Sequence, residues 1–447
     1  MSDPQVLKPE KDYKEILDNE FPNIEELAKN DLSTAIEKLT VLEKQTRQAS
    51  DMNSTARVLV EVCKVCQQAG EYGTLAEQLQ LLSKKHGQLK GAITKMVQYC
   101  IDLLDSCPTE KIKLDLIETL RTVTDGKIYV EVERARVTRM LSKIKEDAGD
   151  LKEAQEILTS LQVETFGSMD RREKTEFILE QVRLTLARSD FVLAQILSRK
   201  ISTKAFDNEE FHDLKLRYYE LMIRIGLEND SYLDITKYYH HVYSTPSVAN
   251  DSSKWHDILS NVVYFIILSP YNNEQSDLLH RVANDTALLE LPMHHELLKC
   301  FTNVELMRWP RIEEIYGPHL RSTPVFAKGD SKAEKRYEAL KNRVIEHNIR
   351  VVAKYYSRIT LPRLQQLLDL SATETESQLS ALVSNKSIYA RIDRPAQIVT
   401  FQKARKSEEV LKDWSYDVGQ LIGGIEKIRQ MVMKEHTLVE IEPRVTA

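Results

Sequence analysis

The amino-acid sequence predicts a mainly α-helical protein in three parts. These are an arm of stacked, TPR-like helical hairpins over residues 1–325, a winged helix over 335–405, and a long C-terminal helix over 407–440. Three observations predict this order. A short helical pattern recurs along the arm, residues 339–401 read as three helices followed by two strands, and the apolar residues after 410 follow a heptad spacing.

The arm is predicted from a segment in which a break and an acidic residue precede an amphipathic helix. It recurs at Asp31, Glu71, Asp150, Asp190 and, more loosely, Asp230. The spacing of ~40 residues, with one degenerate unit skipped, is typical of stacked helical hairpins. Each acidic residue is expected to start the second helix of a hairpin, where the helix dipole favours negative charge. The small or apolar residues that follow at a fixed distance, where two helices can approach closely, are Ala35, Leu75, Ala154, Ala194 and Ile235. A chance recurrence is the alternative.

The end of the arm is placed in the charged stretch 321–335. Thr323-Pro324 and Gly329-Asp330 interrupt the helical periodicity there. Such breaks inside a polar stretch are typical of an exposed linker.

The winged helix is predicted from capping signals and periodicity. Its first helix is expected to run to Ile359 and to be buried on two sides, because apolar residues occupy two adjacent faces. Thr360 is expected to cap the second helix, with Pro362 in its first turn. Ser371 and Glu374 form a capping-box pattern for the third helix. That helix is expected to bury Leu379, Leu382 and Val383.

The wing is predicted from alternation after the third helix. Ile388, Ala390 and Ile392 should face one way and Tyr389, Arg391 and Asp393 the other. Residues 394–396 supply a turn, and 397–401 return as the second strand.

The charge of the third helix distinguishes DNA binding from protein pairing, the two uses of a winged helix considered for this chain. A DNA-reading helix needs basic and amide side chains, whereas the third helix carries Glu374 and Glu376 and has only Lys386 at its end. Protein pairing through a free wing edge is therefore favoured over a nucleic-acid-binding regulator, which would show salt-dependent affinity. The residues predicted to form this partner interface are Tyr389, Arg391, Val399 and Phe401.

The C-terminal helix carries an apolar seam with alternating steps of three and four residues. Its members are Leu411, Trp414, Val418, Leu421, Ile425, Ile428 and Val432. Three glycines in the same segment would each weaken an isolated helix by up to about 1 kcal/mol. The helix is therefore predicted to oligomerise with partner helices; the alternative is that it packs on its own winged helix.

Composition and motifs give no sign of catalysis. The net charge is −6 with a pI of about 6.1, which argues against bulk binding to nucleic acid or anionic membranes. No apolar run is long enough to span a bilayer, and residues 1–15 lack the apolar core of a signal peptide. Cys63-x-x-Cys66 has no second pair at zinc spacing, and His295-Glu296 lacks the second histidine of a metalloprotease helix. No catalytic, metal or cofactor-binding residue is predicted.

Several stretches resemble one known family. They are LEKQTRQASD (42–51), LLSKKHGQLK (81–90), GKIYVEVERARVT (126–138), LQVETFGSMD (161–170), ELMRWP (305–310) and VIEHNIRVVAKYYSRITL (344–361). The arm-plus-winged-helix order and these stretches resemble the PCI family, the scaffold subunits of the proteasome lid, the COP9 signalosome and a translation initiation factor. Within it they look most like a lid subunit of the 26S proteasome. The last residues, 439–447, depart from the family's tail.

The resemblance implies a non-catalytic scaffold that works without a cofactor. Family members line up through their winged helices and gather their C-terminal helices into a bundle. The implied partners are other lid PCI subunits, the separate deubiquitinating subunit and the ATPase base, in a hetero-oligomer of the cytoplasm and nucleus without nucleic acid or membrane. A signalosome or initiation-factor scaffold is the alternative assignment.

Overall fold

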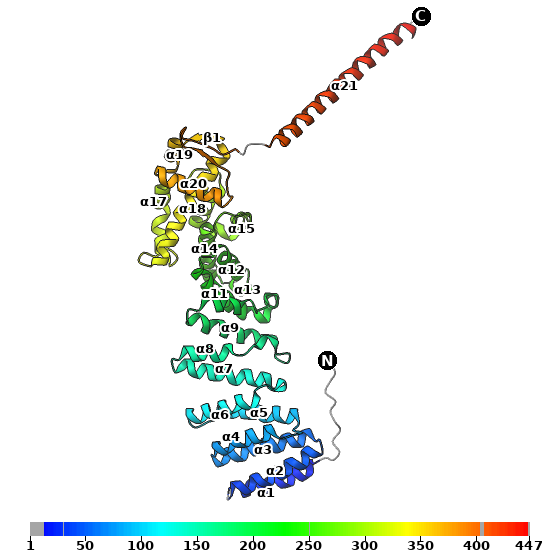
Figure 1. Ribbon diagram of the computed structural model, residues 1–447, viewed down its shortest axis with the longest axis vertical. Helices are drawn as coiled ribbons and strands as arrows, with labels where there is room; N and C mark the ends of the chain where they lie inside the picture. Colours follow the sequence, from blue (N-terminus) through cyan, green and yellow to red (C-terminus); the bar gives the residue numbers. More distant parts are fainter. Residues whose placement is uncertain (1–12, 30, 250, 403–405, 446–447) are drawn as a thin grey trace. The chain divides into compact units, whose positions relative to one another are not determined.

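The computed structural model describes residues 13–29, 31–249, 251–402 and 406–445. It is mainly helical, with one small sheet in the described part (Figure 1). Two compact units divide the chain, Met1–Ile258 and Leu259–Ala447. The predicted fold class, a helical solenoid followed by a winged-helix module and a long final helix, is confirmed.

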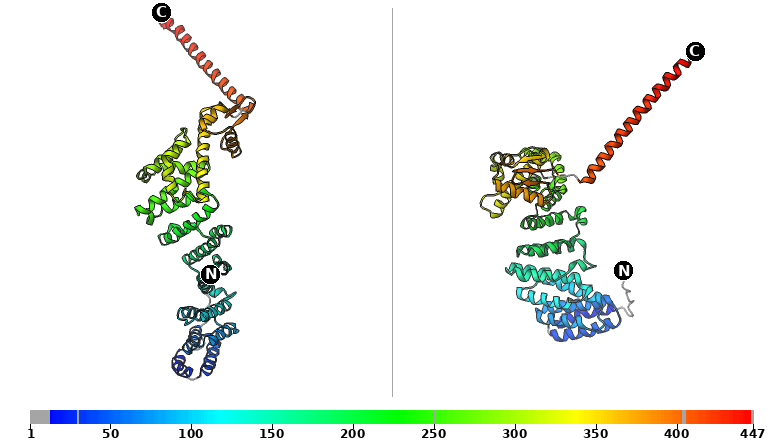
Figure 2. Two further views of the ribbon diagram at one scale, coloured as in Figure 1. Left: turned by 90° about the vertical axis from the view of Figure 1, so that its left-hand side faces the viewer. Right: turned by 45° about the horizontal axis from the view of Figure 1, so that its top comes forward.

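The first unit is a row of helical hairpins that stack in sequence order (Figure 1 and Figure 2). The pairs are α1 (Lys14–Ala28) with α2 (Leu32–Gln48), α3 (Met52–Ala69) with α4 (Tyr72–Lys84), α5 (Lys90–Leu104) with α6 (Glu110–Thr124), α7 (Glu131–Asp147) with α8 (Leu151–Thr159), α9 (Arg171–Ala187) with α10 (Phe191–Ser198), and α11 (His212–Glu228) with α12 (Tyr232–Tyr243). Short 3-10 helices occupy several of the returns between hairpins, namely η1 (Ile128–Val130), η2 (Val163–Thr165), η3 (Thr203–Asp207) and η4 (Glu209–Phe211). Two further helices follow, α13 (Pro246–Ala249) and α14 (Ser252–Leu268), the second of which spans the division between the units.

The acidic residues of the repeat pattern lie where the sequence predicted, at the starts of second helices. Asp31, Asp150 and Asp190 are N-caps whose carboxylates accept hydrogen bonds from backbone amides in the first turn. Glu71 occupies the same position without a side-chain bond, and Asp230 lies one residue before the N-cap of α12. The residues at the fixed later position are all fully buried: Ala35, Leu75, Ala154, Ala194 and Ile235.

The unit that the repeat pattern skipped is the α5–α6 hairpin. Its second helix starts after Thr109, so the acidic signal is absent although the hairpin is present. The Cys63-x-x-Cys66 pair lies buried on α3, with the Cys63 sulfur 3.7 Å from that of Cys100. The hydrogen bond between these thiols and their burial raise the pKa of Cys63, so it stays protonated within the core.

The second unit contains α15 (Asn273–Ala283), η5 (Thr286–Glu290), α16 (Pro292–Thr302), α17 (Trp309–Ser322) and α18 (Ser331–Tyr355), and then the wing module. That module comprises β1 (Arg358–Thr360), α19 (Leu361–Leu368), α20 (Ala372–Ser384), β2 (Arg391–Asp393) and β3 (Ile398–Thr400). The final helix is α21 (Ser407–Val445). Among the described residues, no helix combines the length and apolarity needed to cross a membrane.

The segment 321–335 is only partly the exposed linker that was predicted. Residues 328–332 are exposed, but Val325 and Phe326 are buried. Arg336 donates a hydrogen bond of 2.9 Å to the carbonyl of Val325, and the Phe326 ring packs edge-on against Tyr264. The burial of these two apolar residues holds the segment against the second unit. The charged residues around them made the whole segment look exposed in the sequence.

The first helix of the winged helix ends earlier than predicted. It stops at Tyr355, and Arg358–Thr360 forms a strand instead. This strand pairs antiparallel with β3, which also pairs with β2, so the sheet has three strands in the order β1-β3-β2 rather than two. Three residues are too few for periodicity to separate a strand from the end of a helix.

The remaining local predictions for this module are largely confirmed. Thr360 is the N-cap of α19, although its side chain makes no capping bond, and Pro362 lies in the first turn. The Ser371–Glu374 capping box is present on α20. Val383 is 37% exposed rather than buried. The core of the module consists of Ile345, Ile349, Val352, Ile359, Leu364, Leu368, Leu379, Leu382, Val399 and Phe401.

Candidate assembly surfaces

The described sheet has two edge strands, β1 and β2, and β2 belongs to the wing. β3 is hydrogen-bonded on both sides, whereas β2 is paired on one side only within the described residues. Along this segment Ile392 points toward the core, and Arg391 and Asp393 point to solvent. Unpaired backbone groups on a strand edge can accept a strand from a neighbour, so the outer edge of β2 is a candidate docking edge.

A groove lies between β2 and α20. Its volume of about 1760 Å³ exceeds the ~300–1,000 Å³ typical of small-molecule pockets. Helix residues Glu376 and Ser380 line one side, and wing residues Tyr389 and Arg391 line the other. Across it, Arg394 Nε donates a hydrogen bond of 2.6 Å to Glu376 Oε1, which ties the wing turn to the helix. The groove has the size and mixed polarity of a protein-docking surface.

The four predicted wing residues fall into two pairs. Tyr389 is 43% exposed and Arg391 is also exposed, and both line the groove. Val399 and Phe401 are 0% and 7% exposed and belong to the module's core. Their side chains are therefore not on the surface that a neighbour would meet. The sequence assigned them to an edge strand, whereas β3 is the central strand of the sheet.

The charge at the amino end of α20 disfavours phosphate. A hydrogen bond from the Ser371 hydroxyl lowers the pKa of the Glu374 carboxyl, which keeps it ionised at the start of α20. Arg394 of the wing turn is already paired with Glu376. The helix that would read a DNA groove thus presents carboxylates at its amino end.

The seam of α21 is not covered by the other described residues of the chain. Its seven predicted residues are all exposed, from 38% for Val418 to 66% for Leu421. Sequence reasoning missed further exposed apolar residues of this helix that lie outside the seam, among them Val410, Ile422, Met431 and Leu438. An apolar face wider than a two-residue stripe is typical of a helix that packs against more than one neighbour.

His294, the residue before the His295-Glu296 pair, packs within the second unit. His294 is buried, and its Nε2 lies 2.7 Å from the Tyr264 hydroxyl. Burial and the nearby His319 lower the pKa of His294 to about 4. Across the described ranges, no group of three or more His, Cys, Asp or Glu side chains is arranged to hold a metal ion.

Three protein-family models match most of the chain. Residues 34–251 match the family model "PSMD12/CSN4, N-terminal", 303–403 match "PCI domain", and 408–438 match "26S proteasome regulatory subunit RPN5 C-terminal domain". The last match ends just before residues 439–447, the stretch predicted to depart from the family's tail.

Individual relatives agree over their full lengths. The chain is 51% identical over 438 residues to the 26S proteasome regulatory subunit rpn501 of Schizosaccharomyces pombe, covering 98% of this chain and 99% of the relative. It is 45% identical to the 26S proteasome regulatory subunit RPN5 of Saccharomyces cerevisiae, again covering 98% and 99%. Identity to the 26S proteasome non-ATPase regulatory subunit 12 of Dictyostelium discoideum is 43%, covering 97% and 96%. A hairpin arm, a winged helix and a C-terminal helix that each match this family, in the same order, show that the chain belongs to the RPN5 family of 26S proteasome regulatory subunits, whose members carry a PCI domain.

Proposed function

We propose that this chain is a non-catalytic scaffold subunit of the proteasome regulatory lid. It supports ubiquitin-dependent protein degradation by holding the separate deubiquitinating subunit in place. The observation that carries the proposal is the uncovered apolar face of α21. Such a face on a 39-residue helix is stable in water only when partner helices cover it.

Two surfaces of the chain contact neighbouring subunits, one on the winged helix and one on the C-terminal helix. The β2 edge and its groove join the winged helix of a neighbouring PCI subunit, because they combine unpaired backbone groups with the exposed Tyr389 and Arg391. The C-terminal helix enters a bundle with the corresponding helices of other subunits. The partners are thus other lid PCI subunits, the deubiquitinating subunit and the ATPase base, in the cytoplasm and nucleus.

Two alternatives have less support. A signalosome or initiation-factor scaffold shares the architecture, but the relatives that match over full length are named as proteasome subunits. A nucleic-acid-binding regulator is disfavoured by the carboxylates of Glu374 and Glu376 on α20.

The test is native affinity purification of the tagged full-length chain, followed by quantitative mass spectrometry. Lid and base subunits in near-equal amounts are the expected result. Signalosome subunits or initiation factors alone would overturn the assignment while leaving the fold intact. A monomer, or a chain that carries nucleic acid, would overturn the scaffold proposal itself.

A further inference from the structure

Cationic side chains gather at one edge of the arm, although the whole chain carries a net charge of −6. Lys84 is the last residue of α4, and Lys90 is the first of α5. The loop between them contains Lys85 and His86. Lys127, from the next return, joins them because its Nζ donates a hydrogen bond of 3.3 Å to the carbonyl of Ser83. We call Lys84, Lys85, His86, Lys90 and Lys127 the basic edge.

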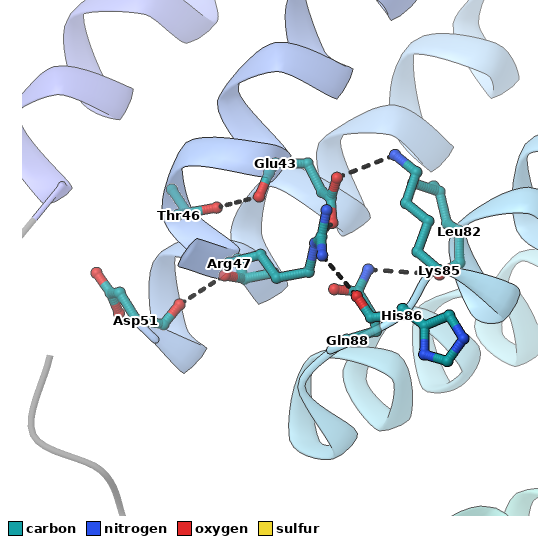
Figure 3. Close-up of polar contacts among 9 residues, drawn as sticks. Glu43, Thr46, Arg47, Asp51, Leu82, Lys85, His86 and Gln88 are labelled. Atoms are coloured by element: carbon teal, nitrogen blue, oxygen red, sulfur yellow. Dashed lines mark hydrogen bonds and ion pairs between the residues drawn. The ribbon is translucent and has the colours of Figure 1, made fainter. Parts of the chain in front are cut away.

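A buried carboxylate fixes the loop of the basic edge. Figure 3 shows Glu43 of α2 between the side chains of Arg47 and Lys85. Its side chain is fully buried, and its two oxygens accept hydrogen bonds of 2.9 Å from Arg47 Nε and Lys85 Nζ. Arg47 Nη1 also donates a bond of 2.6 Å to the carbonyl of His86. Removing one partner of a buried ion pair is costly, so this network holds the loop in one conformation.

The outer cations of the basic edge are not neutralised from within the described residues. Lys84 and Lys90 are exposed, and neither forms an ion pair there. Three of the nearby carboxylates are already engaged. Glu43 holds its two cations, Asp51 accepts from the first amides of α3, and Asp125 pairs with Arg134 at 2.5 Å. The edge therefore keeps a net positive charge.

A nearby anion would stabilise the charged form of Lys127 more than it would stabilise that of a fully solvated lysine. Burial lowers its pKa, and its amine bonds only to a neutral carbonyl. An approaching carboxylate would stabilise the charged form of this partly desolvated amine.

An apolar side chain stands beside these cations. Ile128 is 78% exposed, the highest value among the large apolar side chains of the described residues. Its 3-10 helix is held against α5, where Thr94 Oγ1 donates a hydrogen bond of 3.3 Å to the carbonyl of Tyr129. Thr94 lies one turn after Lys90 on that helix. A lone exposed isoleucine is ordinary, but here it is held next to uncompensated lysines.

We propose that the basic edge, together with Ile128, is a docking surface for an acidic segment of a protein partner that carries an apolar residue. Carboxylates of the segment pair with Lys84, Lys90 and Lys127, and its apolar side chain covers Ile128. A nucleic acid fits less well, because stable duplex binding uses about 6–10 phosphate contacts and its backbone offers nothing to cover an isoleucine. The scaffold function proposed above assigns no partner to this surface of the arm.

The direct test is a titration of the full-length chain with a fluorescent peptide of repeating Glu-Glu-Leu. Lys84→Glu/Lys90→Glu should weaken binding by about tenfold or more, since it reverses two rim charges. The matched control is Lys111→Glu/Lys152→Glu, which reverses two exposed lysines at the starts of α6 and α8 and should change affinity less than ~2-fold. Equal losses in both variants, or no binding by the unaltered chain, would refute the proposal.

Two further measurements test the apolar contact and the preference for a peptide over a nucleic acid. Ile128→Ala should weaken the peptide by about threefold or more, while Ile128→Leu should not, because the contact is apolar and not shape-specific. A single-stranded oligonucleotide of equal charge should bind more weakly than the peptide. If the oligonucleotide binds as tightly as the peptide, and Lys84→Glu/Lys90→Glu abolishes its binding, the surface is a general polyanion site and the proposal fails.

The same surface can be tested in the purified native assembly. Zero-length carbodiimide cross-linking joins a lysine amine to a carboxylate in contact with it. Lys84 or Lys90 should be joined to an Asp or Glu of another subunit, and both should react more slowly with an amine-acetylating reagent than they do in the free chain. Unchanged reactivity without cross-links would overturn the docking proposal. A chain that purifies without partners would instead overturn the scaffold proposal, and the peptide titration would still decide this one.

Discussion

Charge placed in the seam of α21 is expected to block assembly without unfolding the chain. The change is Leu421→Asp with Ile425→Asp. These side chains are 66% and 57% exposed within the chain. Full burial of such a side chain contributes about 1.5–3 kcal/mol, so covering the exposed parts would contribute roughly 1–2 kcal/mol each.

Each aspartate loses that contribution and adds the cost of burying a carboxylate, which is several kcal/mol. The double variant should therefore weaken association by at least ~4 kcal/mol, or about a thousandfold. The folded free chain should be unchanged, because neither side chain contacts a core.

The assay is a competition between a tagged variant and the untagged unaltered chain expressed together, with the incorporated fraction read by quantitative mass spectrometry of the native complex. Circular dichroism of the free chain checks folding. Gln420→Asp/Gln430→Asp is the control, since it adds the same charge to the same helix at positions outside the seam. Normal incorporation of Leu421→Asp/Ile425→Asp, or equal exclusion of the control, would refute the reasoning.

Three other predictions concern the second unit. Asn348→Ala should destabilise it by about 2–4 kcal/mol, because its buried side chain bonds both the N–H and the C=O of Met307, at 2.8 and 2.6 Å; thermal unfolding checks this, with the partly buried Asn342→Ala expected to have little effect. Ser371→Ala should remove the capping box of α20 and cost about 1 kcal/mol, seen as a lower unfolding temperature, whereas Ser371→Thr should keep most of the stability. Acidification should weaken the unit through His294, whose pKa falls from an ordinary 6.5 to about 4 on folding. Between those values the unfolded chain binds the extra proton, so stability is fully present above about pH 6.5 and is lost as the pH falls toward 4; denaturant unfolding of His294→Gln should show a shallower loss over that window, and an identical slope would contradict the assignment.

Sequence reasoning worked where one strong local signal coincided with burial. The repeat acids predicted second helices because an N-cap carboxylate and a buried small residue, such as Asp150 with Ala154, both repeat at fixed spacing. The Ser371–Glu374 box located α20 in the same way. The hairpin of α5 and α6 was predicted only as a degenerate unit, because the N-cap of α6, Thr109, carries no charge.

The errors lie where tertiary pairing outweighs local pattern. Arg358–Thr360 is a strand only because β3 lies beside it, and β3 comes 38 residues later in the register Arg358–Thr400, Thr360–Ile398. That placement also moves Val399 and Phe401 from a predicted edge into the core. The apolar seam of α21 was predictable from spacing, but the width of its apolar face became visible only with the exposed fractions of Ile422 and Met431.

The strand order of the wing has a consequence for synthesis. The central strand of the sheet, β3, is the last to leave the ribosome, and neither β1 nor β2 can be paired before it. A chain that stops before Ile398 therefore has no sheet, and it also lacks α21, which begins nine residues later at Ser407. Docking edge and assembly helix are thus completed by the same final stretch of translation. On the proposed assembly, a product that stops before Ile398 has neither surface and should not compete for a place in the complex.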